Sequence, residues 1–159
     1  MRQKLLLLRA IEDSDIELLS KWLYKDYILK WYHEPEEWLY EMKERKGAFS
    51  FLSHFLVLQE NIPLGFCQYY DCFDAQEEWY SVENPGKIYS IDYLIGDETY
   101  LGKGYGKEIV KMLIQKIVEE KNPEAIVVQP ENENIASCKA LEANGFVYDA
   151  DKEYYILRF

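Results

Sequence analysis

At residues 101–107 the chain reads Leu-Gly-Lys-Gly-Tyr-Gly-Lys, directly before residues 108–119, whose apolar periodicity predicts a helix. The alternate glycines leave the backbone bare where that helix begins, so several N–H groups and the positive end of the helix can face one anion. Residues 90–95, Ser-Ile-Asp-Tyr-Leu-Ile, predict a strand just before this loop. The order of strand, glycine loop and helix predicts a pyrophosphate-binding site.

The spacing of the glycines excludes two common nucleotide-binding motifs. A Rossmann fingerprint requires G-x-G-x-x-G with a downstream acidic residue, and a P-loop requires G-x-x-x-x-G-K-[ST]. Neither pattern occurs in the loop. A tight turn without a ligand remains the alternative from these residues alone.

A second segment, residues 134–146, reads Asn-Ile-Ala-Ser-Cys-Lys-Ala-Leu-Glu-Ala-Asn-Gly-Phe. An Asn that opens a helix ending in Gly-Phe, placed after the glycine loop, resembles the second signature of the GNAT superfamily of N-acetyltransferases. The resemblance implies an α/β (α+β) fold, with a mixed, mostly antiparallel central sheet flanked by helices and splayed at an acyl-CoA site. It also implies that the glycine loop binds acyl-CoA.

Length and composition limit the possible classes of protein. We expect one domain over residues 1–159, because a chain of 159 residues is long enough to form its own core. A hydrophobic fraction of 48% excludes a disordered chain. With 18 Lys and Arg against 29 Asp and Glu, the net charge is −11, which opposes nucleic-acid binding and attracts a cationic substrate. Solubility alone is the other explanation of this charge.

The sequence predicts neither a metal site nor a membrane segment. The apolar run in residues 1–8 is too short for a signal peptide, and nothing approaches the ~20 apolar residues of a membrane span. The cysteines are odd in number and lack metal-pair spacing, so we expect reduced thiols in the cytoplasm. The cysteines and histidines are Cys67, Cys72, Cys138, His33 and His54.

Local patterns predict the other elements. Ser14 and Glu17 have the spacing of a capping box, which predicts a helix from Asp15. Glu60 with Asn61 predicts a hairpin turn, and Gly65 a bulge in the strand that follows. Strands are expected at 4–9, 55–59, 63–72, 90–95, 125–129 and 153–158, the last closing the sheet, and further helices at 27–32, 36–46, 108–119 and 134–144.

A narrower resemblance covers nearly the whole chain. It is carried by Trp22-Leu23, Trp31-Tyr32, Pro63-Leu64-Gly65-Phe66, Gln68, Tyr70, Trp79-Tyr80, Ile91-Asp92 and the 101–106 loop. In this order these residues look like the aminoglycoside 6'-N-acetyltransferases. That family implies an acetyl-CoA-dependent antibiotic-resistance enzyme, in which a primary amine, the 6'-amine of a small polycationic substrate, attacks the thioester directly.

The resemblance also implies which residues bind the cofactor. Backbone N–H groups of residues 103–107 hold the pyrophosphate, Asn134 contacts the pantetheine arm, and the strand through Tyr93 and Leu94 pairs with that arm like an extra strand. The expected cofactor-binding residues are Tyr93, Leu94, Leu101, Gly102, Lys103, Gly104, Tyr105, Gly106, Lys107 and Asn134.

By the same resemblance Asp92 is the catalytic residue, and Glu77, Trp79 and Tyr80 line the substrate cleft with it. A protonated amine has no lone pair with which to attack, so a carboxylate that holds the cation and removes its proton fits this chemistry. Each residue also has a structural explanation: a solvated strand carboxylate for Asp92, core packing for Trp79, and a solvated charge run for Glu77 with its neighbour. For Cys138, small-residue packing is favoured over a nucleophile.

Three positions depart from the family pattern. Leu101 stands where Arg or Gln is preferred, Leu141 where many members have a Tyr that protonates the leaving thiolate, and Gln129 where the aminoglycoside enzymes have an acidic residue. These departures leave the general acid open. They also leave a polyamine, a siderophore lysine or a protein amine as alternative substrates, and a non-catalytic acyl-CoA sensor as an alternative function. A monomer and a homodimer are both compatible with the sequence.

Overall fold

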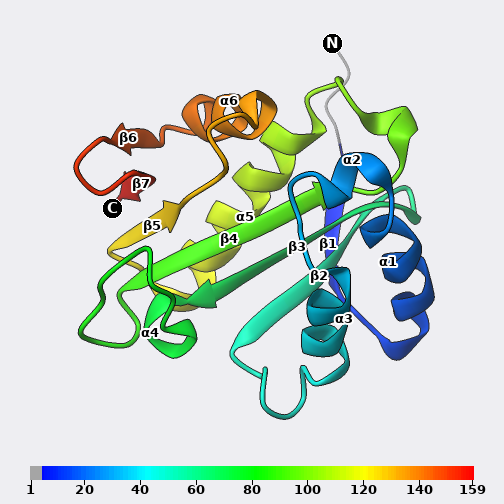
Figure 1. Cartoon of the computed structure of the whole chain (residues 1–159), viewed down its shortest axis with the longest axis horizontal. Helices are drawn as coiled ribbons and strands as arrows, with labels where there is room; N and C mark the ends of the chain where they lie inside the picture. The colour runs from blue at the N-terminus through cyan, green and yellow to red at the C-terminus, as the bar shows by residue number, and fades with distance from the viewer. Residues whose placement is uncertain (1–4) are drawn as a thin grey trace.

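A seven-stranded sheet forms the centre of the molecule, in the order β1-β2-β3-β4-β5-β7-β6 (Figure 1). The structure is a computed structural model, and it describes residues 5–159. Neighbouring strands are antiparallel except β4 and β5, which are parallel. This confirms the mixed, mostly antiparallel sheet. The strands are β1 (Leu6–Ala10), β2 (Leu52–Gln59), β3 (Ile62–Asp71), β4 (Ile88–Ile95), β5 (Ala125–Val128), β6 (Val147–Asp149) and β7 (Tyr154–Arg158).

Helices cover both faces of this sheet. Because side chains alternate along a strand, Phe55 and Val57 of β2 pack in the core under α5 and α6, whereas Leu56 and Leu58 pack under α1, α2 and α3. The helices are α1 (Ile16–Leu23), α2 (Asp26–Leu29), α3 (Pro35–Lys43), α4 (Cys72–Ala75), α5 (Tyr105–Lys121) and α6 (Ile135–Ala143), with short 3-10 helices at Asp13–Asp15 and Glu98–Tyr100. No helix in residues 5–159 is long and apolar enough to cross a membrane.

The sheet opens between β4 and β5, as the resemblance to the GNAT superfamily implies. These two strands pair only at Ile88 with Ala125 and at Tyr89 with Ile126. From Ser90 onward they diverge, so this edge of β4 is not paired with β5. Residues from the second half of β4 and from the start of α6 line one cavity.

The hairpin between β2 and β3 is confirmed. Glu60 and Asn61 have φ values of 51° and 67°, the left-handed pair that a tight hairpin turn requires. The register shifts opposite Gly65, where Leu64 is the extra residue of a bulge. A Cβ on Gly65 would lie 2.4 Å from the carbonyl oxygen of Leu94, so this glycine also permits close approach of β3 to β4.

Several local predictions are wrong or incomplete. The capping box is formed by Glu12 and Asp15, not by Ser14 and Glu17: the Glu12 N–H donates to Asp15 Oδ2 at 2.8 Å. Arg9 holds the same carboxylate at 3.0 and 3.1 Å, which orients Asp15 for this role. The α-helix begins at Ile16, after a 3-10 turn.

The end of the sheet also differs from the prediction. β7 does not close the sheet, because β6 pairs outside it. β6 is three residues long and mostly exposed, so its sequence has no alternation of apolar and polar residues that would predict a strand. The short helix α4 was likewise missed, since its Asp71 cap stands in an acidic stretch without helical periodicity. Residue 4, expected in the first strand, lies outside the described residues.

Candidate active site

Two cavities meet beside the free edge of β4. The first, of about 610 Å³, lies between β4, α2, the 101–107 loop and α6, and we call it the loop cavity. The second, of about 580 Å³, extends from the same point toward α3 and residues 75–79, and we call it the acidic cleft. The residues that line both are Trp31, Tyr32, Tyr93, Asn134 and Ser137.

The glycine loop forms one wall of the loop cavity. Gly102 and Gly104 have φ values of 70° and 83°, which L side chains rarely adopt, and Gly104 is the N-cap of α5. Within the first turn of α5, the N–H groups of Gly106 and Lys107 have no acceptor in the helix because of their place at its start, so they can bind an anion. Of the predicted loop residues, Leu101, Gly102, Gly104, Tyr105, Gly106 and Lys107 line the cavity, whereas Lys103 does not.

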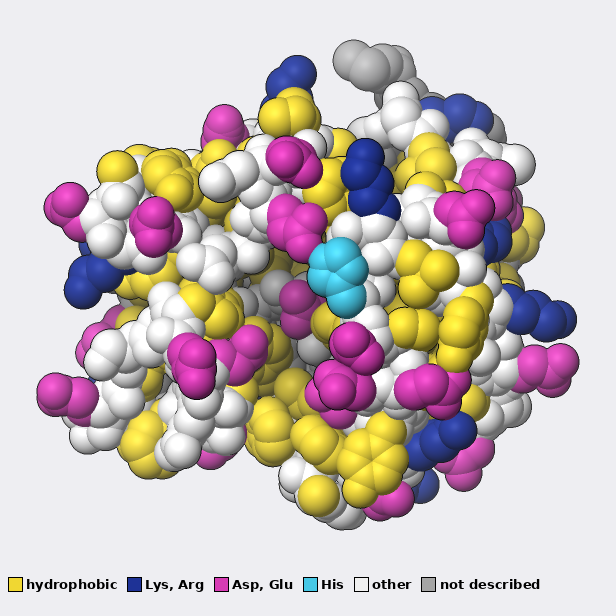
Figure 2. Space-filling view, in the orientation of Figure 1, with side chains coloured by type: hydrophobic (Ala, Val, Ile, Leu, Met, Phe, Trp, Pro, Cys, Tyr) yellow, Lys and Arg dark blue, Asp and Glu magenta, His cyan; other side chains and the backbone are white. Residues whose placement is uncertain are grey.

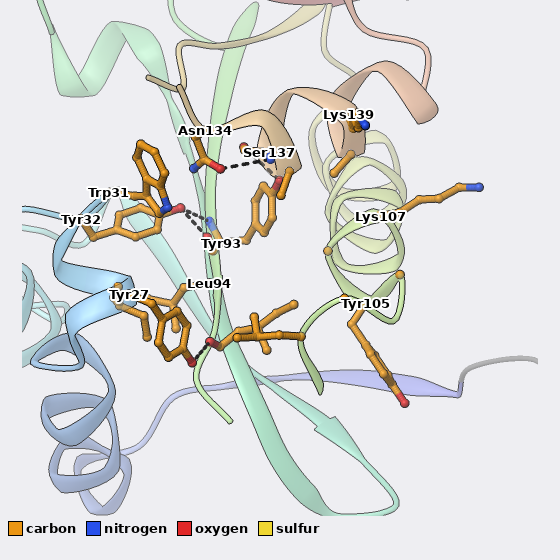
Figure 3. Close-up of a pocket in the computed structure, with 18 of the residues that line it drawn as sticks. Tyr27, Trp31, Tyr32, Tyr93, Leu94, Tyr105, Lys107, Asn134, Ser137 and Lys139 are labelled. Carbon is orange, nitrogen blue, oxygen red and sulfur yellow. Dashed lines mark hydrogen bonds between the residues drawn. The ribbon is translucent and has the colours of Figure 1, made fainter. Parts of the chain in front are cut away.

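Positive side chains surround the same cavity. Lys30, Lys107 and Lys139 line it, and Figure 3 shows the last two on α5 and α6, on the same side. Within residues 5–159 none of these lysines has a carboxylate oxygen within 4.0 Å. In a chain of net charge −11, a cavity lined by a helix start and by three lysines that have no carboxylate partner in residues 5–159 fits a polyanionic group. The residues present therefore suit the diphosphate of a coenzyme.

Tyrosine hydroxyls occupy the free edge of β4. The Tyr32 hydroxyl accepts a hydrogen bond from the Tyr93 N–H at 3.2 Å and donates to the Tyr93 carbonyl (Figure 3). The Tyr27 hydroxyl donates to the Ile95 carbonyl at 2.7 Å. An extended ligand that pairs with Tyr93 therefore has to displace the Tyr32 hydroxyl. Leu94 is buried under α1 and α2 and contributes to the cavity wall.

Asn134 caps α6, as its place before the predicted helix suggested. Its Oδ1 accepts a hydrogen bond from the Ser137 N–H at 3.2 Å. Asn134 lines both cavities, so it lies where an arm passing from one to the other would run.

The second cavity is strongly acidic. Figure 2 shows acidic side chains gathered around the hollow near the middle of this face. The cleft has five carboxylates, from Glu37, Glu41, Glu77, Asp92 and Glu131. Among the residues that the structure describes, only Glu131 of these five is paired with a basic group, His33 Nε2 at 2.7 Å. This arrangement attracts a ligand with several positive charges.

Asp92 lies at the floor of the acidic cleft, on β4 and directly across from Gln68 of β3. Gln68 Nε2 donates to Asp92 Oδ2 at 2.9 Å. Burial is the main cause that raises the pKa of Asp92 to about 7; the hydrogen bond from Gln68 opposes this shift, and the charges of Glu77 and Glu41 contribute to it. A carboxyl that titrates near neutrality is suited to accept a proton from an amine.

Glu77 is held in a fixed position at the cleft. Its two oxygens accept hydrogen bonds from the Tyr70 hydroxyl at 2.6 Å and Trp79 Nε1 at 3.1 Å. The Tyr80 hydroxyl accepts from the Glu77 N–H at 3.1 Å and donates to the Cys72 carbonyl at 2.9 Å. Trp79 lines the cleft and packs against a core cluster as well, whereas Tyr80 supports this turn without lining the cleft.

Several residues of the site were not found by the sequence analysis. Gln68 was noted only for the family resemblance, yet it contacts Asp92, and its buried Oε1 has no partner within residues 5–159. Glu41 is one helical turn after Glu37, a spacing that places both on one face of α3. Burial raises the pKa of Glu41 to about 7, with Glu77 and Glu37 adding to the shift.

The remaining candidates have structural surroundings. Leu141 is fully buried in the core between α5, α6 and the sheet. Cys138 is half-buried on α6, and Cys67 and Cys72 are buried free thiols. Gln129 Nε2 donates to the Glu153 carbonyl at 2.9 Å. Among residues 5–159 no group of three or more His, Cys, Asp and Glu side chains is placed to hold a metal ion.

Comparison with known proteins identifies the family. The family model described as "Acetyltransferase (GNAT) domain" matches residues 6–147, most of the chain. The chain belongs to the GNAT acetyltransferase family. This membership confirms the predicted reaction class, acyl-CoA-dependent N-acetyl transfer, and acetyl-CoA as the cofactor of this GNAT protein.

Individual proteins that are similar to this GNAT protein are also acetyltransferases. It is 23% identical over 145 residues to the aminoglycoside N(6')-acetyltransferase type 1 of Klebsiella pneumoniae, covering 87% of this chain and 72% of the relative. The structure of aminoglycoside acetyltransferase AAC(6')-Ib with coenzyme A and kanamycin superimposes with a TM-score of 0.83 at 22% identity, over 97% of this chain and 95% of that one. The aminoglycoside N(6')-acetyltransferase of Legionella pneumophila superimposes with a TM-score of 0.74 at 18% identity, over 98% and 92%.

Proposed function

We propose that this GNAT protein transfers an acetyl group from acetyl-CoA to a primary amine of a small polycationic substrate of the aminoglycoside type, at its 6'-amine. The observation that carries the proposal is the meeting of the two cavities. A lysine-lined cavity with an anion-binding helix start opens into a cleft with five carboxylates, and Asp92 lies close to the junction. An anionic donor and a cationic acceptor are thus each given a complementary site.

The loop cavity supplies the cofactor contacts. The N–H groups of Tyr105, Gly106 and Lys107 would hold the diphosphate, with Lys30 and Lys139 nearby. Asn134 and the β4 edge at Tyr93 would hold the arm that leads to the acidic cleft. When bound, acetyl-CoA supplies a thioester whose carbonyl carbon accepts a neutral amine.

The acidic cleft supplies the amine. A primary amine with a pKa of about 10.4 is protonated at neutral pH, so Asp92 must take its proton, directly or through water. Glu77 and Glu41 hold the other positive charges of the substrate. Gln68 keeps the Asp92 carboxylate oriented by a hydrogen bond of 2.9 Å.

The decisive experiment follows free thiol release from acetyl-CoA with a panel of amines: kanamycin, tobramycin, spermidine and a lysine peptide. Turnover of the aminoglycosides that is lost in Asp92→Asn supports the proposal. Asp151→Asn, an exposed carboxylate in the β6–β7 turn, is the matched control and should retain activity. Binding of acetyl-CoA without release against any amine would favour a sensor and contradict the proposal.

One observation favours a second substrate class. Position 129 has an amide and not a carboxylate, so it offers no anion to a substrate amine. The Gln129 amide donates instead to the Glu153 carbonyl. A linear polyamine needs fewer fixed anchors than an aminoglycoside. Turnover with spermidine alone would move the substrate to that class while keeping the reaction.

A further inference from the structure

Two hydroxyl groups form a pair where the cavities meet. The Tyr93 hydroxyl lies 3.0 Å from Ser137 Oγ, and both residues line the loop cavity and the acidic cleft. Tyr93 comes from β4, next to Asp92, and Ser137 from the first turn of α6 (Figure 3). The pair therefore lies where a donor bound in one cavity meets an acceptor bound in the other.

This pair keeps a hydrogen available to a ligand. Two hydroxyls carry two hydrogens, and their mutual bond uses one. Within residues 5–159 neither hydroxyl has another hydrogen-bond partner. Other tyrosines of the loop cavity donate to protein acceptors: Tyr27 to the Ile95 carbonyl, Tyr32 to the Tyr93 carbonyl and Tyr105 to Gln59 Oε1.

The pair is also held in place. A Cβ built on Gly106 would lie 3.5 Å from Tyr93 Cε2, so the ring lies against the bare backbone at the start of α5. The Ser137 N–H is tied to Asn134 Oδ1. Burial raises the pKa of Tyr93 to about 12, so its phenol stays protonated at neutral pH and acts as a hydrogen-bond donor.

We propose that the Tyr93 hydroxyl, oriented by Ser137, donates a hydrogen bond to the coenzyme sulfur as the acetyl group leaves it. This inference rests on the proposed function. The amine nitrogen bonds to the acetyl carbon, the carbon–sulfur bond breaks, and its electron pair goes to sulfur. The amine proton goes to Asp92, while the phenol hydrogen stays on its oxygen and is shared with the thiolate.

The hydroxyl pair lies near Leu141, the position at which many members of the family have a Tyr. Ser137 and Leu141 are four residues apart on α6, so they share a face of the helix. A helical side chain leans toward the N-terminus, which means that a residue at 141 covers the turn at 137. Leu141 has no hydroxyl and is buried, and Tyr93 brings one to the same turn from the strand.

The test measures the bound coenzyme as well as the rate. The pKa of the thiol in the CoA complex is read from thiolate ultraviolet absorption, with desulfo-CoA complexes subtracting tyrosine ionisation. Tyr93→Phe should raise this thiol pKa by about one to two units, because a hydrogen bond to the anion is lost. Ser137→Ala should give a smaller rise, and Tyr148→Phe on β6, which is exposed, no change.

Kinetics supply the second measurement. Tyr93→Phe should lower kcat about 10- to 100-fold with little change in the KM of the amine, because the contact forms as charge develops on sulfur. CoA binding by calorimetry and thermal unfolding establish that the variant is folded.

The outcomes separate the two proposals. An unchanged thiol pKa and kcat in Tyr93→Phe would overturn the role of this hydroxyl while acetyl transfer by the wild-type protein still stands. A wild-type protein that binds no CoA would overturn the proposed function itself.

Discussion

Asp92 combines a functional requirement with a cost in stability. Its side chain is half-buried at the cleft floor, and the raised pKa, about 7, means that the folded protein disfavours the charged form that the proposed reaction needs. Ionisable groups placed in this way occur at functional sites more often than elsewhere. The residue can be tested through both properties.

Asp92→Asn should abolish activity and stabilise the protein above neutral pH. Because the folded-state pKa is raised, the stability associated with Asp92 is present below its unfolded pKa of about 3.9 and is lost as pH rises through about 7. An Asn at this position does not ionise, so the variant does not lose this stability. In urea unfolding, its free energy of unfolding should exceed that of the wild type by about 1 to 3 kcal/mol above pH 8 and should equal it near pH 4. A variant less stable than wild type at high pH would contradict the raised pKa.

Gln68→Leu should shift the pH dependence of the reaction. Gln68 is buried and its amide favours the ionised form of Asp92, so its loss raises the pKa of that carboxyl further. The rise of kcat/KM with pH should move to higher pH, with about a tenfold loss of activity at neutrality. Leu is a suitable replacement because its volume is similar to that of Gln. A pH dependence of kcat/KM that stays unchanged would contradict a role of Gln68 in setting the pKa of Asp92.

His54 should make the protein less stable in acid. It is buried on β2, neither ring nitrogen has a hydrogen-bond partner within residues 5–159, and burial with Arg45 nearby lowers its pKa to about 4. The unfolded chain binds a proton from about pH 6.5 downward, so stability falls as pH drops from that value toward 4. In His54→Leu this part of the pH dependence should disappear from urea unfolding curves, while activity is retained.

At the scale of elements, the glycine loop joins a strand to a helix and serves two functions in one turn. Left-handed backbone at Gly102 and Gly104 reverses the chain, and the same geometry exposes the N–H groups at the start of α5. The divergence of β4 and β5 provides the space beside it. A substitution in the loop should therefore affect both stability and coenzyme binding, whereas one in another left-handed turn should affect stability alone.

Gly104→Ala should reduce both the stability of the protein and its affinity for the coenzyme, whereas Gly86→Ala should reduce stability only. Both glycines have left-handed φ values, 83° and 77°, so each alanine should cost about 1 kcal/mol of stability. Gly86 is in an exposed turn away from the loop cavity and has nothing within 4 Å of a built Cβ. Calorimetry with CoA should show weaker binding for the Gly104 variant alone; equal affinities would exclude the loop as the coenzyme site.

At the scale of the whole molecule, charge is divided between two neighbouring cavities. Lysines with no ion-pair partner in residues 5–159 line one cavity and five carboxylates line the other, although the net charge of the chain is −11. An anionic coenzyme and the cationic acceptor that we propose would therefore be attracted to different sites in one molecule.

Ionic strength should accordingly weaken the capture of the amine. The KM of a polycationic substrate should rise about tenfold between low and high salt, because the attraction is screened over about a Debye length. The KM of acetyl-CoA should change much less, since a local lysine cluster is opposed by the negative charge of the whole protein. Steady-state kinetics across a salt series test this, and a KM of the amine that does not depend on salt would contradict the electrostatic role of the cleft.

The sequence by itself determined the family, the order of most elements and the position of the glycine loop between a strand and a helix. These depend on local features that a chain carries in its spacing: alternate glycines before a helix, an Asn before another, and alternation along strands. Asp92 was predicted because a motif places it, and the net charge indicated a cationic ligand.

Only the tertiary structure decided which side chains meet. Gln68 lies opposite Asp92 through strand pairing, Glu41 reaches the cleft from α3, and Tyr93 reaches Ser137 across 44 positions of sequence. It also removed Tyr80 and Lys103 from the cavity walls. The reason is physical: burial, hydrogen bonding and pKa depend on distances between elements that are remote in sequence, and local spacing carries no information about them.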